Sequence, residues 1–260
     1  APIRLKNNKL SKAFEMLTKM YGMPDYGEFD PTPLLAPFYA LFFGMCVGDA
    51  GYGLLLVLLG LYLKKKVSKS MAGLMNLLIT LGVATTIVGA VFNTFFGASI
   101  TDLDLPEWMN SLIISGKWDG LAYDKTMVIA LLVGMFHICF AMGVKAVCET
   151  VRYGFKNSLS AWAWLLLIGG SVTVATLNYL GVIDMEMSKM AFIGIGCVSA
   201  IGIYLLNNLR RNVFVNIGAG LWDTYNMATG ILGDLLSYLR LYALGLAGGM
   251  LGGVFNSLGM

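Results

Sequence analysis

Long apolar runs without a single charge divide this sequence. No Asp, Glu, Lys or Arg occurs within 70–101, 126–144, 159–183, 190–209 or 241–260. Runs of about 20 residues match the hydrocarbon thickness of a bilayer, and an α-helix satisfies its backbone hydrogen bonds internally. The pattern predicts an all-α fold, a polytopic bundle of transmembrane helices.

A further apolar block extends from Leu34 to Leu63, which is too long for one untilted crossing. Three glycines surround Asp49 within 48–53, and glycine disfavours a helix interior. We therefore expect a short helical hairpin here, with Asp49 accepting hydrogen bonds at its turn. The about seven predicted membrane segments are 33–48, 51–63, 71–98, 126–148, 159–181, 189–208 and 224–258, the last a long tilted helix.

The distribution of basic residues supports the hairpin. With two arms in 33–63, the predicted inner segments hold most of the 18 basic residues, which obeys the positive-inside rule. These segments are the N-terminus, Lys64–Lys66, Lys145 with Arg152, and Arg210 with Arg211. The N-terminus is therefore predicted to be cytoplasmic, with residues 1–30 forming an amphipathic stub or linker.

Composition excludes several classes of protein. Mean hydropathy is +0.73, and 13% of residues are charged, against roughly 25% in soluble domains. A soluble enzyme, a nucleic-acid binder and a secreted disulfide scaffold are thereby ruled out as primary interpretations. The four cysteines show no CxxC or Cys/His spacing, and the chain has no GxxxxGK[ST] motif, so we expect no metal, no cofactor and no nucleotide site.

One basic residue, Arg240, interrupts an apolar stretch. Burying an arginine near the bilayer centre costs at least about 2.5–3.5 kcal/mol, so its guanidinium needs an anionic or carbonyl partner, or water. Helical geometry places Asp234 about 120° around the helix from it, which favours a partner on another helix or subunit. The residues that share its face are mostly small: Gly233, Leu236, Ser237, Ala243, Leu244 and Ala247. The simpler alternative is an internal ion pair between two helices.

Two segments resemble subunit a, called subunit I in prokaryotes, of the V/A-type rotary ATPases. They are DLLSYLRLYALGLA at 234–247, similar to the arginine helix, and PFYALFFGMCVGDAGYG at 37–53, similar to the first membrane hairpin. The resemblance extends over the chain from about residue 31. It also implies a large cytosolic N-terminal domain and an eighth span, both of which we expect to be missing here.

The resemblance implies a membrane stator without catalytic activity of its own. Residues 31–260 would form its ion-translocation domain in a prokaryotic inner or plasma membrane. Arg240 matches the arginine that contacts a membrane-buried Glu of a rotating proteolipid ring while H⁺ or Na⁺ passes through two half-channels. The implied partners are that ring, the peripheral-stalk and central-stalk subunits of the rotary ATPase, and the lipid bilayer, with no nucleic acid.

Other polar residues are weaker candidates for the half-channels. Asp234, Ser237, Tyr238 and Asn226 lie on the arginine helix, where they are candidates for an inner half-channel. Asn93 and Thr94 are candidates for an outer one. His137, the only histidine, titrates in a range that suits a proton relay, although a packing role is the simpler interpretation. Glu149 is expected to form a surface ion pair with Lys145 or Arg152.

Two other functions remain compatible with the residues. A self-contained secondary transporter would use Arg240 to bind an anionic substrate beside a broken helix at 48–53. A related second half of the chain, typical of such transporters, is not visible. The third possibility is a non-conducting assembly scaffold.

Overall fold

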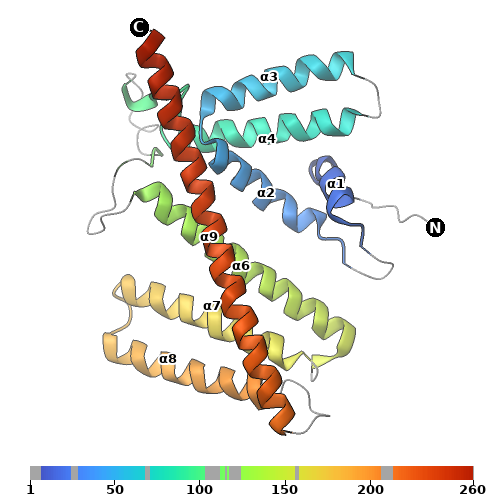
Figure 1. The fold of residues 1–260 in the computed structure, drawn as a ribbon, viewed down its shortest axis with the longest axis vertical. Helices are drawn as coiled ribbons and strands as arrows, with labels where there is room; N and C mark the ends of the chain where they lie inside the picture. Colours follow the sequence, from blue (N-terminus) through green and yellow to red (C-terminus); the bar gives the residue numbers. More distant parts are fainter. Residues whose placement is uncertain are drawn as a thin grey trace, which may run out of the picture. The chain divides into compact units, whose positions relative to one another are not determined.

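The computed structural model describes residues 7–24, 29–67, 71–102, 112–114, 116, 124–155, 158–205 and 213–259. The α-helices in this part of the chain are α1 (Lys9–Tyr21), α2 (Thr32–Val47), α3 (Ala50–Lys66), α4 (Ala72–Val91), α6 (Lys125–Tyr153), α7 (Leu159–Tyr179), α8 (Met185–Ala200) and α9 (Val213–Gly259). A π-helical turn, η4 (Ile201–Leu205), continues α8. The predicted all-α architecture is confirmed (Figure 1).

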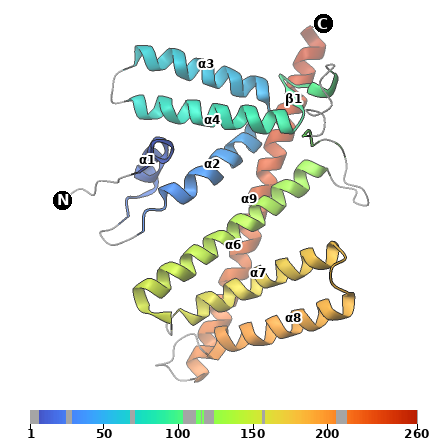
Figure 2. The ribbon, with the colours of Figure 1, turned by 180° about the vertical axis from the view of Figure 1, so that it is seen from behind.

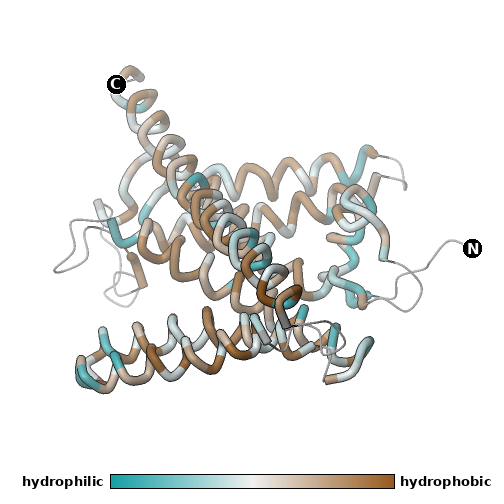
Figure 3. Tube along the Cα trace, turned by 60° about the horizontal axis from the view of Figure 1, so that its bottom comes forward, coloured by the Kyte–Doolittle hydropathy of each residue, from teal (hydrophilic) through white to brown (hydrophobic). Residues whose placement is uncertain are grey.

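Five helices are long and apolar enough to cross a membrane: Ala72–Val91, Lys125–Tyr153, Leu159–Tyr179, Met185–Tyr204 and Phe214–Gly259. The helix Thr32–Val47 is apolar but shorter. Figure 3 shows hydrophobic residues along the helices, with hydrophilic turns interrupting α9. The seven predicted segments therefore correspond to helices α2, α3, α4, α6, α7, α8 and α9. Arg210 and Arg211 lie outside the described residues.

The chain forms two compact units, joined by the continuous helices α6 and α9. The first comprises residues 1–132 and 237–260, and the second comprises residues 133–236. Within the first unit, α3 and α4 lie side by side (Figures 1 and 2). Within the second unit, α7 and α8 do the same.

The break predicted between 33–48 and 51–63 is confirmed, but the two arms do not pair with each other. Helix α2 ends at Gly48, whose φ of 61° is left-handed and favours glycine, and α3 begins after Asp49. Helix α3 packs mainly on α4 rather than on α2. The tight hairpin is thus α3–α4, and α2 approaches α4 separately.

Small residues allow α3 and α4 to approach closely. A Cβ atom built on Gly53 would lie 2.5 Å from Thr86 N, and one on Gly82 would lie 2.9 Å from Val57 N. A Cβ on Gly89 would overlap the backbone of Asp49 and Ala50. Close approach of this kind is how membrane helices associate, since lipid offers no hydrophobic driving force.

The structure corrects the segment predicted as a helix over 71–98. Helix α4 ends at Val91, and the chain forms a small antiparallel hairpin of β1 (Thr94–Phe95) and β2 (Ala98–Ser99), followed by η2 (Ile100–Asp102). Asn93 and Phe96 have positive φ angles of 65° and 49°, which an α-helix does not permit. Apolar composition continues through 92–98, so hydropathy alone did not reveal the turn.

A polar network attaches α1 to the start of α2. The Asp30 carboxylate accepts hydrogen bonds from Thr32 N (2.9 Å), Thr32 Oγ1 (2.6 Å) and Asn7 Nδ2 (2.9 Å). The buried hydroxyls of Thr18 and Thr32 are 2.8 Å apart. Burial of the Asp30 carboxyl opposes ionisation, but the hydrogen bonds from Thr32 and Asn7 outweigh it and lower the pKa of Asp30.

Candidate functional site

Arg240 lies on α9, in the part of this helix that belongs to the first unit, and its side chain is exposed. Among the described residues, none places a carboxylate within ion-pair distance of its guanidinium. An ion pair elsewhere in the described chain joins Lys145 and Glu149, at 3.9 Å. That pair joins residues four apart on α6, as predicted for Glu149.

The opposite side of α9 is packed against the first unit. The Tyr238 ring contacts that of Phe42, with centroids 5.2 Å apart. A Cβ on Gly245 would lie 2.6 Å from Met45 O, so α9 touches the end of α2 through backbone. At 100° per residue, Arg240 points about 150° away from the mean direction of these packed positions. Packing of α9 against α2 therefore directs the Arg240 guanidinium away from the other helices of the first unit.

The face of α9 around Arg240 stays open. Ser237, Ala243 and Ala247 are exposed beside it, as are the bulkier Leu236 and Leu244. Small residues let another helix approach an arginine closely. The small-residue face that the helical spacing predicted is thus uncovered within the described chain.

Asp234 and His137 come together in the second unit. Asp234 lies on α9 and His137 on α6, and the two groups are near enough for an electrostatic interaction. His137 is half-buried, whereas Asp234 is exposed. The sequence identified both residues separately but did not pair them, because their proximity depends on how α6 and α9 meet.

Asn226 lines a polar cavity of the second unit with a volume of about 420 Å³. Its polar lining comes from three helices: Lys145 and Glu149 of α6, Ser160 of α7, and Asp223 and Asn226 of α9. Trp162 and Ser158 both approach the Thr150 hydroxyl, at 2.9 and 2.8 Å, and so join α6 to the start of α7 beside the cavity. The cavity lies at the ends of helices predicted to face inward.

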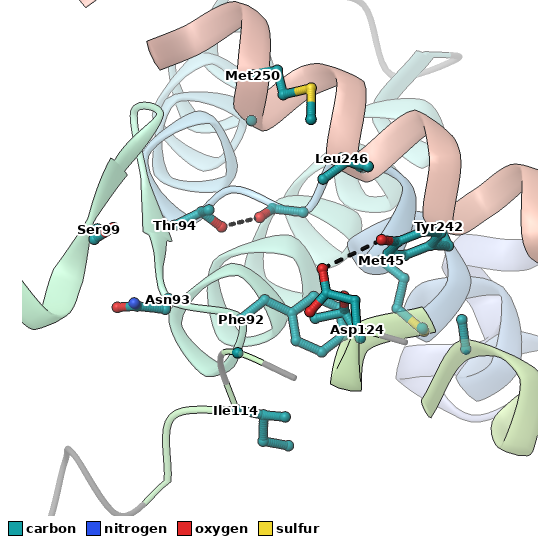
Figure 4. A pocket seen from close by; sticks show the side chains of 16 residues that line it. Met45, Phe92, Asn93, Thr94, Ser99, Ile114, Asp124, Tyr242, Leu246 and Met250 are labelled. Atoms are coloured by element: carbon teal, nitrogen blue, oxygen red, sulfur yellow. Dashed lines mark hydrogen bonds between the residues drawn. The ribbon is translucent and has the colours of Figure 1, made fainter. Parts of the chain in front are cut away.

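A second cavity of about 370 Å³ lies in the first unit (Figure 4). Asn93 and Thr94 line it, together with Asp124 and Tyr242. The Tyr242 hydroxyl donates to Asp124 Oδ2 at 3.3 Å, and the Thr94 hydroxyl donates to the carbonyl of Gly48. Sequence reasoning missed Asp124 and Tyr242, although Asp124 stands directly before an apolar helix and Tyr242 only two residues after Arg240.

Asp49 has the hydrogen-bonding role predicted for it. It is 3% exposed, and its Oδ1 accepts from the backbone N–H groups of Gly51 at 2.8 Å and Tyr52 at 3.1 Å. These are the donors at the first turn of α3, which lack partners within the helix. The carboxylate therefore begins α3 where glycines end α2.

The chain is similar in sequence to a V-type ATPase subunit family and to A-type ATP synthase subunits. The sequence profile of the V-type ATPase 116kDa subunit family matches residues 1–117. The A-type ATP synthase subunit I of Methanocaldococcus jannaschii is 32% identical over 280 residues, which cover 98% of this chain and 40% of that protein.

Two further relatives show the same coverage. The A-type ATP synthase subunit I of Pyrococcus horikoshii is 31% identical, over 95% of this chain and 36% of its own length. The V-type ATP synthase subunit I 1 of Treponema pallidum is 28% identical, over 99% of this chain and 42% of its own length. The chain thus spans about two fifths of the length of these relatives.

Proposed function

Because the chain belongs to the V-type ATPase 116kDa subunit family, we propose that it is the membrane stator part of a rotary ATPase and carries the arginine essential for ion translocation. The observation that carries this proposal is Arg240: a permanent cation on an exposed, small-residue face of an apolar helix, with no carboxylate of the described chain in reach. The missing counter-ion then belongs to a neighbouring protein, a proteolipid ring with a membrane-buried Glu.

A fixed guanidinium has two effects on a passing carboxylate. It favours the ionised form, so H⁺ or Na⁺ leaves the ring carboxylate before it reaches Arg240 and rebinds after it has passed. It also places a positive barrier between the two aqueous paths, which prevents an ion from crossing directly between them. The chain itself performs no bond chemistry in this scheme, and ATP hydrolysis or synthesis belongs to other subunits.

The polar cavity of the second unit is our candidate for the mouth of the inner half-channel. Asn226 and Asp223 line it on α9, and Lys145 and Glu149 face them from α6. Asp234 lies about 12 Å further along α9 than Asn226 by helix rise, next to His137. This order would lead an ion from the cavity past two titratable groups; Ser237 and Tyr238 continue the series.

The cavity of the first unit is our candidate for the outer path. Asn93, Thr94 and Asp124 contribute polar atoms to it, and Tyr242 brings it within two residues of Arg240 along α9. The segment before α6 is predicted to face outward by the positive-inside rule. An ion entering this cavity would reach α9 on the side of the helix that carries Tyr242 and Gly245.

Substitution of Arg240 in the intact complex tests the function. Arg240→Ala and Arg240→Lys should abolish ATP-driven ion pumping while the complex still assembles, since Lys lacks the planar, always-charged fork of Arg. Arg152→Lys, the same exchange at the end of α6, is the matched control and should pump normally. Pumping retained by Arg240→Ala would overturn the proposal. Substrate uptake by liposomes that contain this chain alone would favour a transporter instead.

A further inference from the structure

One stripe of α9 makes close contacts with three places in the first unit: Asp124, the junction of α2 and α3, and the β1–β2 hairpin. Tyr242, Gly245, Gly252 and Asn256 lie within about 40° of one direction on the helix, by 100° per residue. Tyr242 bonds Asp124, and Gly245 lies against Met45 O, near the end of α2. These contacts hold the part of the stripe next to Arg240.

The other part of the stripe is held by the turn between β1 and β2. Asn256 Nδ2 donates to Phe96 O at 2.7 Å. A Cβ on Gly252 would lie 2.9 Å from the Cα of Gly97, so helix and turn meet backbone to backbone. One close backbone contact and one hydrogen bond therefore tie α9 to a turn of only two residues.

The conformation of that turn depends on Asp49. Phe96 and Gly97 both have positive φ, at 49° and 76°, which is unfavourable for phenylalanine. Their successive N–H groups converge on the Asp49 carboxylate: Phe96 N on Oδ1 at 2.9 Å and Gly97 N on Oδ2 at 2.8 Å. Consecutive backbone donors in such a turn form an anion-binding concavity, and here the anion is a side chain of the same protein.

We propose that Asp49 is a positioning residue for Arg240. By organising the β1–β2 turn, it sets the rotation and axial position of α9, and hence the side on which the guanidinium faces. The inference rests on the proposed function of Arg240. It assigns to the buried Asp49 a role in ion translocation, in addition to its role at the first turn of α3.

Helix geometry makes this control stringent. A slip of one residue along α9 turns every side chain by about 100°, which would carry Arg240 from the open face toward the side of the helix. Stripe positions need glycine, because a methyl group at Gly245 or Gly252 meets backbone atoms that cannot move independently. If the β1–β2 turn loses its hydrogen bonds to Asp49, the backbone position against which α9 packs changes, and the position of α9 changes with it.

A distance measurement within the first unit tests the positioning directly. In the intact complex, with native cysteines replaced, nitroxide labels are placed at Leu58 on α3 and Leu244 on α9, both exposed. Pulsed electron spin resonance should give one narrow distance distribution. Asp49→Asn, whose NH₂ group would face backbone donors, should shift or broaden it, and so should Gly252→Ala. Gly248→Ala adds the same methyl at an ordinary 3.8 Å from Val47 O and should leave it unchanged.

The functional measurement uses the same variants without labels. Ions pumped per ATP hydrolysed should fall about tenfold in Gly252→Ala and Asp49→Asn, because misplacing a reacting group by ~1 Å costs up to about 100-fold. Asn256→Ala, which removes one bond without adding volume, should lower the ratio less. Its matched control is Ser257→Ala, whose hydroxyl bonds only Val254 O within α9.

The outcomes separate this inference from the function on which it rests. If Arg240→Ala abolishes pumping but Asp49→Asn and Gly252→Ala leave both the distance distribution and the pumping ratio unchanged, the positioning role is wrong and the stator function stands. If Arg240→Ala pumps normally, the stator function is wrong. A distance change without loss of pumping would also overturn the positioning role. Should Asp49→Asn fail to assemble, Gly252→Ala and Asn256→Ala decide the question.

Discussion

Arg240 and its packed neighbours occupy opposite sides of the same turns of α9. Tyr238 and Tyr242 lie against the first unit through Phe42 and Asp124, whereas Arg240 stays exposed. Leaving a cation unpaired in lipid costs several kcal/mol, and this cost is the physical reason for proposing a counter-charge on a neighbouring protein. At the scale of one residue, the exposed Arg240 guanidinium, without a carboxylate partner among the described residues, is the strongest support for the proposed function.

Asp30 allows a prediction of pH dependence outside the membrane segments. Its pKa is lowered in the folded chain from an unfolded value of about 3.9. The stabilisation it provides is therefore complete above about pH 4 and is lost as the pH falls through the lower folded pKa. A nitroxide at Met20, 74% exposed on α1, should become more mobile in that range because α1 loses its anchor to α2.

Substitution of Asp30 supplies the control for this titration. Asp30→Ala should weaken the docking of α1 by about 2 kcal/mol, so that the label is mobile already at neutral pH and insensitive to acid. Glu15→Ala, which removes an acid of α1 itself, should behave like the unsubstituted chain. Identical titrations of the label in Asp30→Ala and the unsubstituted chain would show that Asp30 does not anchor α1.

At the scale of elements, α3 and α4 depend on glycine for their close approach. Gly53 faces Thr86, Gly82 faces Val57, and Gly89 faces the Asp49–Ala50 backbone. In a membrane such contacts replace the hydrophobic effect as the source of association. The junction of α2 and α3 at Gly48 and Asp49 is therefore stabilised by packing against Gly89 as well as by the hydrogen bonds of the Asp49 carboxylate.

Gly→Ala substitutions in α4 test whether this close approach of α3 and α4 stabilises the protein. Gly89→Ala should destabilise the protein by about 1–3 kcal/mol, as overpacking does. Gly73→Ala on the same helix has nothing within 4 Å of the added Cβ, and should be neutral or stabilise by up to about 1 kcal/mol. Thermal unfolding of the purified protein measures both. Equal melting temperatures for the two variants would show that the close approach at Gly89 does not stabilise the protein.

The arginine helix differs from the others in length. Helix α9 has 47 residues, or about 70 Å by helix rise, more than twice a hydrocarbon core of about 30 Å. It begins at Val213, eleven residues earlier than predicted, because the helix continues through the glycines at 218 and 220. Tyr204 bonds Thr224 at 3.1 Å and packs against Gly220, which holds this first part to the second unit.

At the scale of the whole molecule, a cavity lies in each unit among the described residues, and α9 contributes to both. The cavity of the second unit includes Asn226, and that of the first unit includes Tyr242. Two separate aqueous paths on one helix, with a cation along it, are what a half-channel mechanism requires. Hydration of the cavities is therefore the property to measure.

Cysteine reactivity tests hydration of the cavity in the second unit. In a cysteine-free background, Asn226→Cys should react with a charged methanethiosulfonate added from the cytoplasmic side, because a thiolate forms only where water reaches it. Leu232→Cys is the control: it is 60% exposed on α9 but does not line the cavity, and should be protected by lipid. Equal reaction rates at the two positions would remove the basis for an inner half-channel here.

The sequence by itself determined the fold class and the approximate positions of the helices, and it singled out Arg240 as the candidate for ion translocation. Each follows from a local free energy: transfer of a run of side chains into lipid, the cost of glycine within a helix, or the cost of one charge within an apolar run. Asp49 was recognisable for the same reason, as an acid between glycines at a predicted break.

Only the tertiary structure decided which side of α9 is packed and which is open. The pairing of α3 with α4, the turn at Phe96 and Gly97, the Asp124–Tyr242 bond and the proximity of Asp234 to His137 join residues far apart in the chain. These contacts depend on shape and backbone approach, which hydropathy along one dimension does not encode. The direction of Arg240 is therefore a property of the folded unit, although its presence is a property of the sequence.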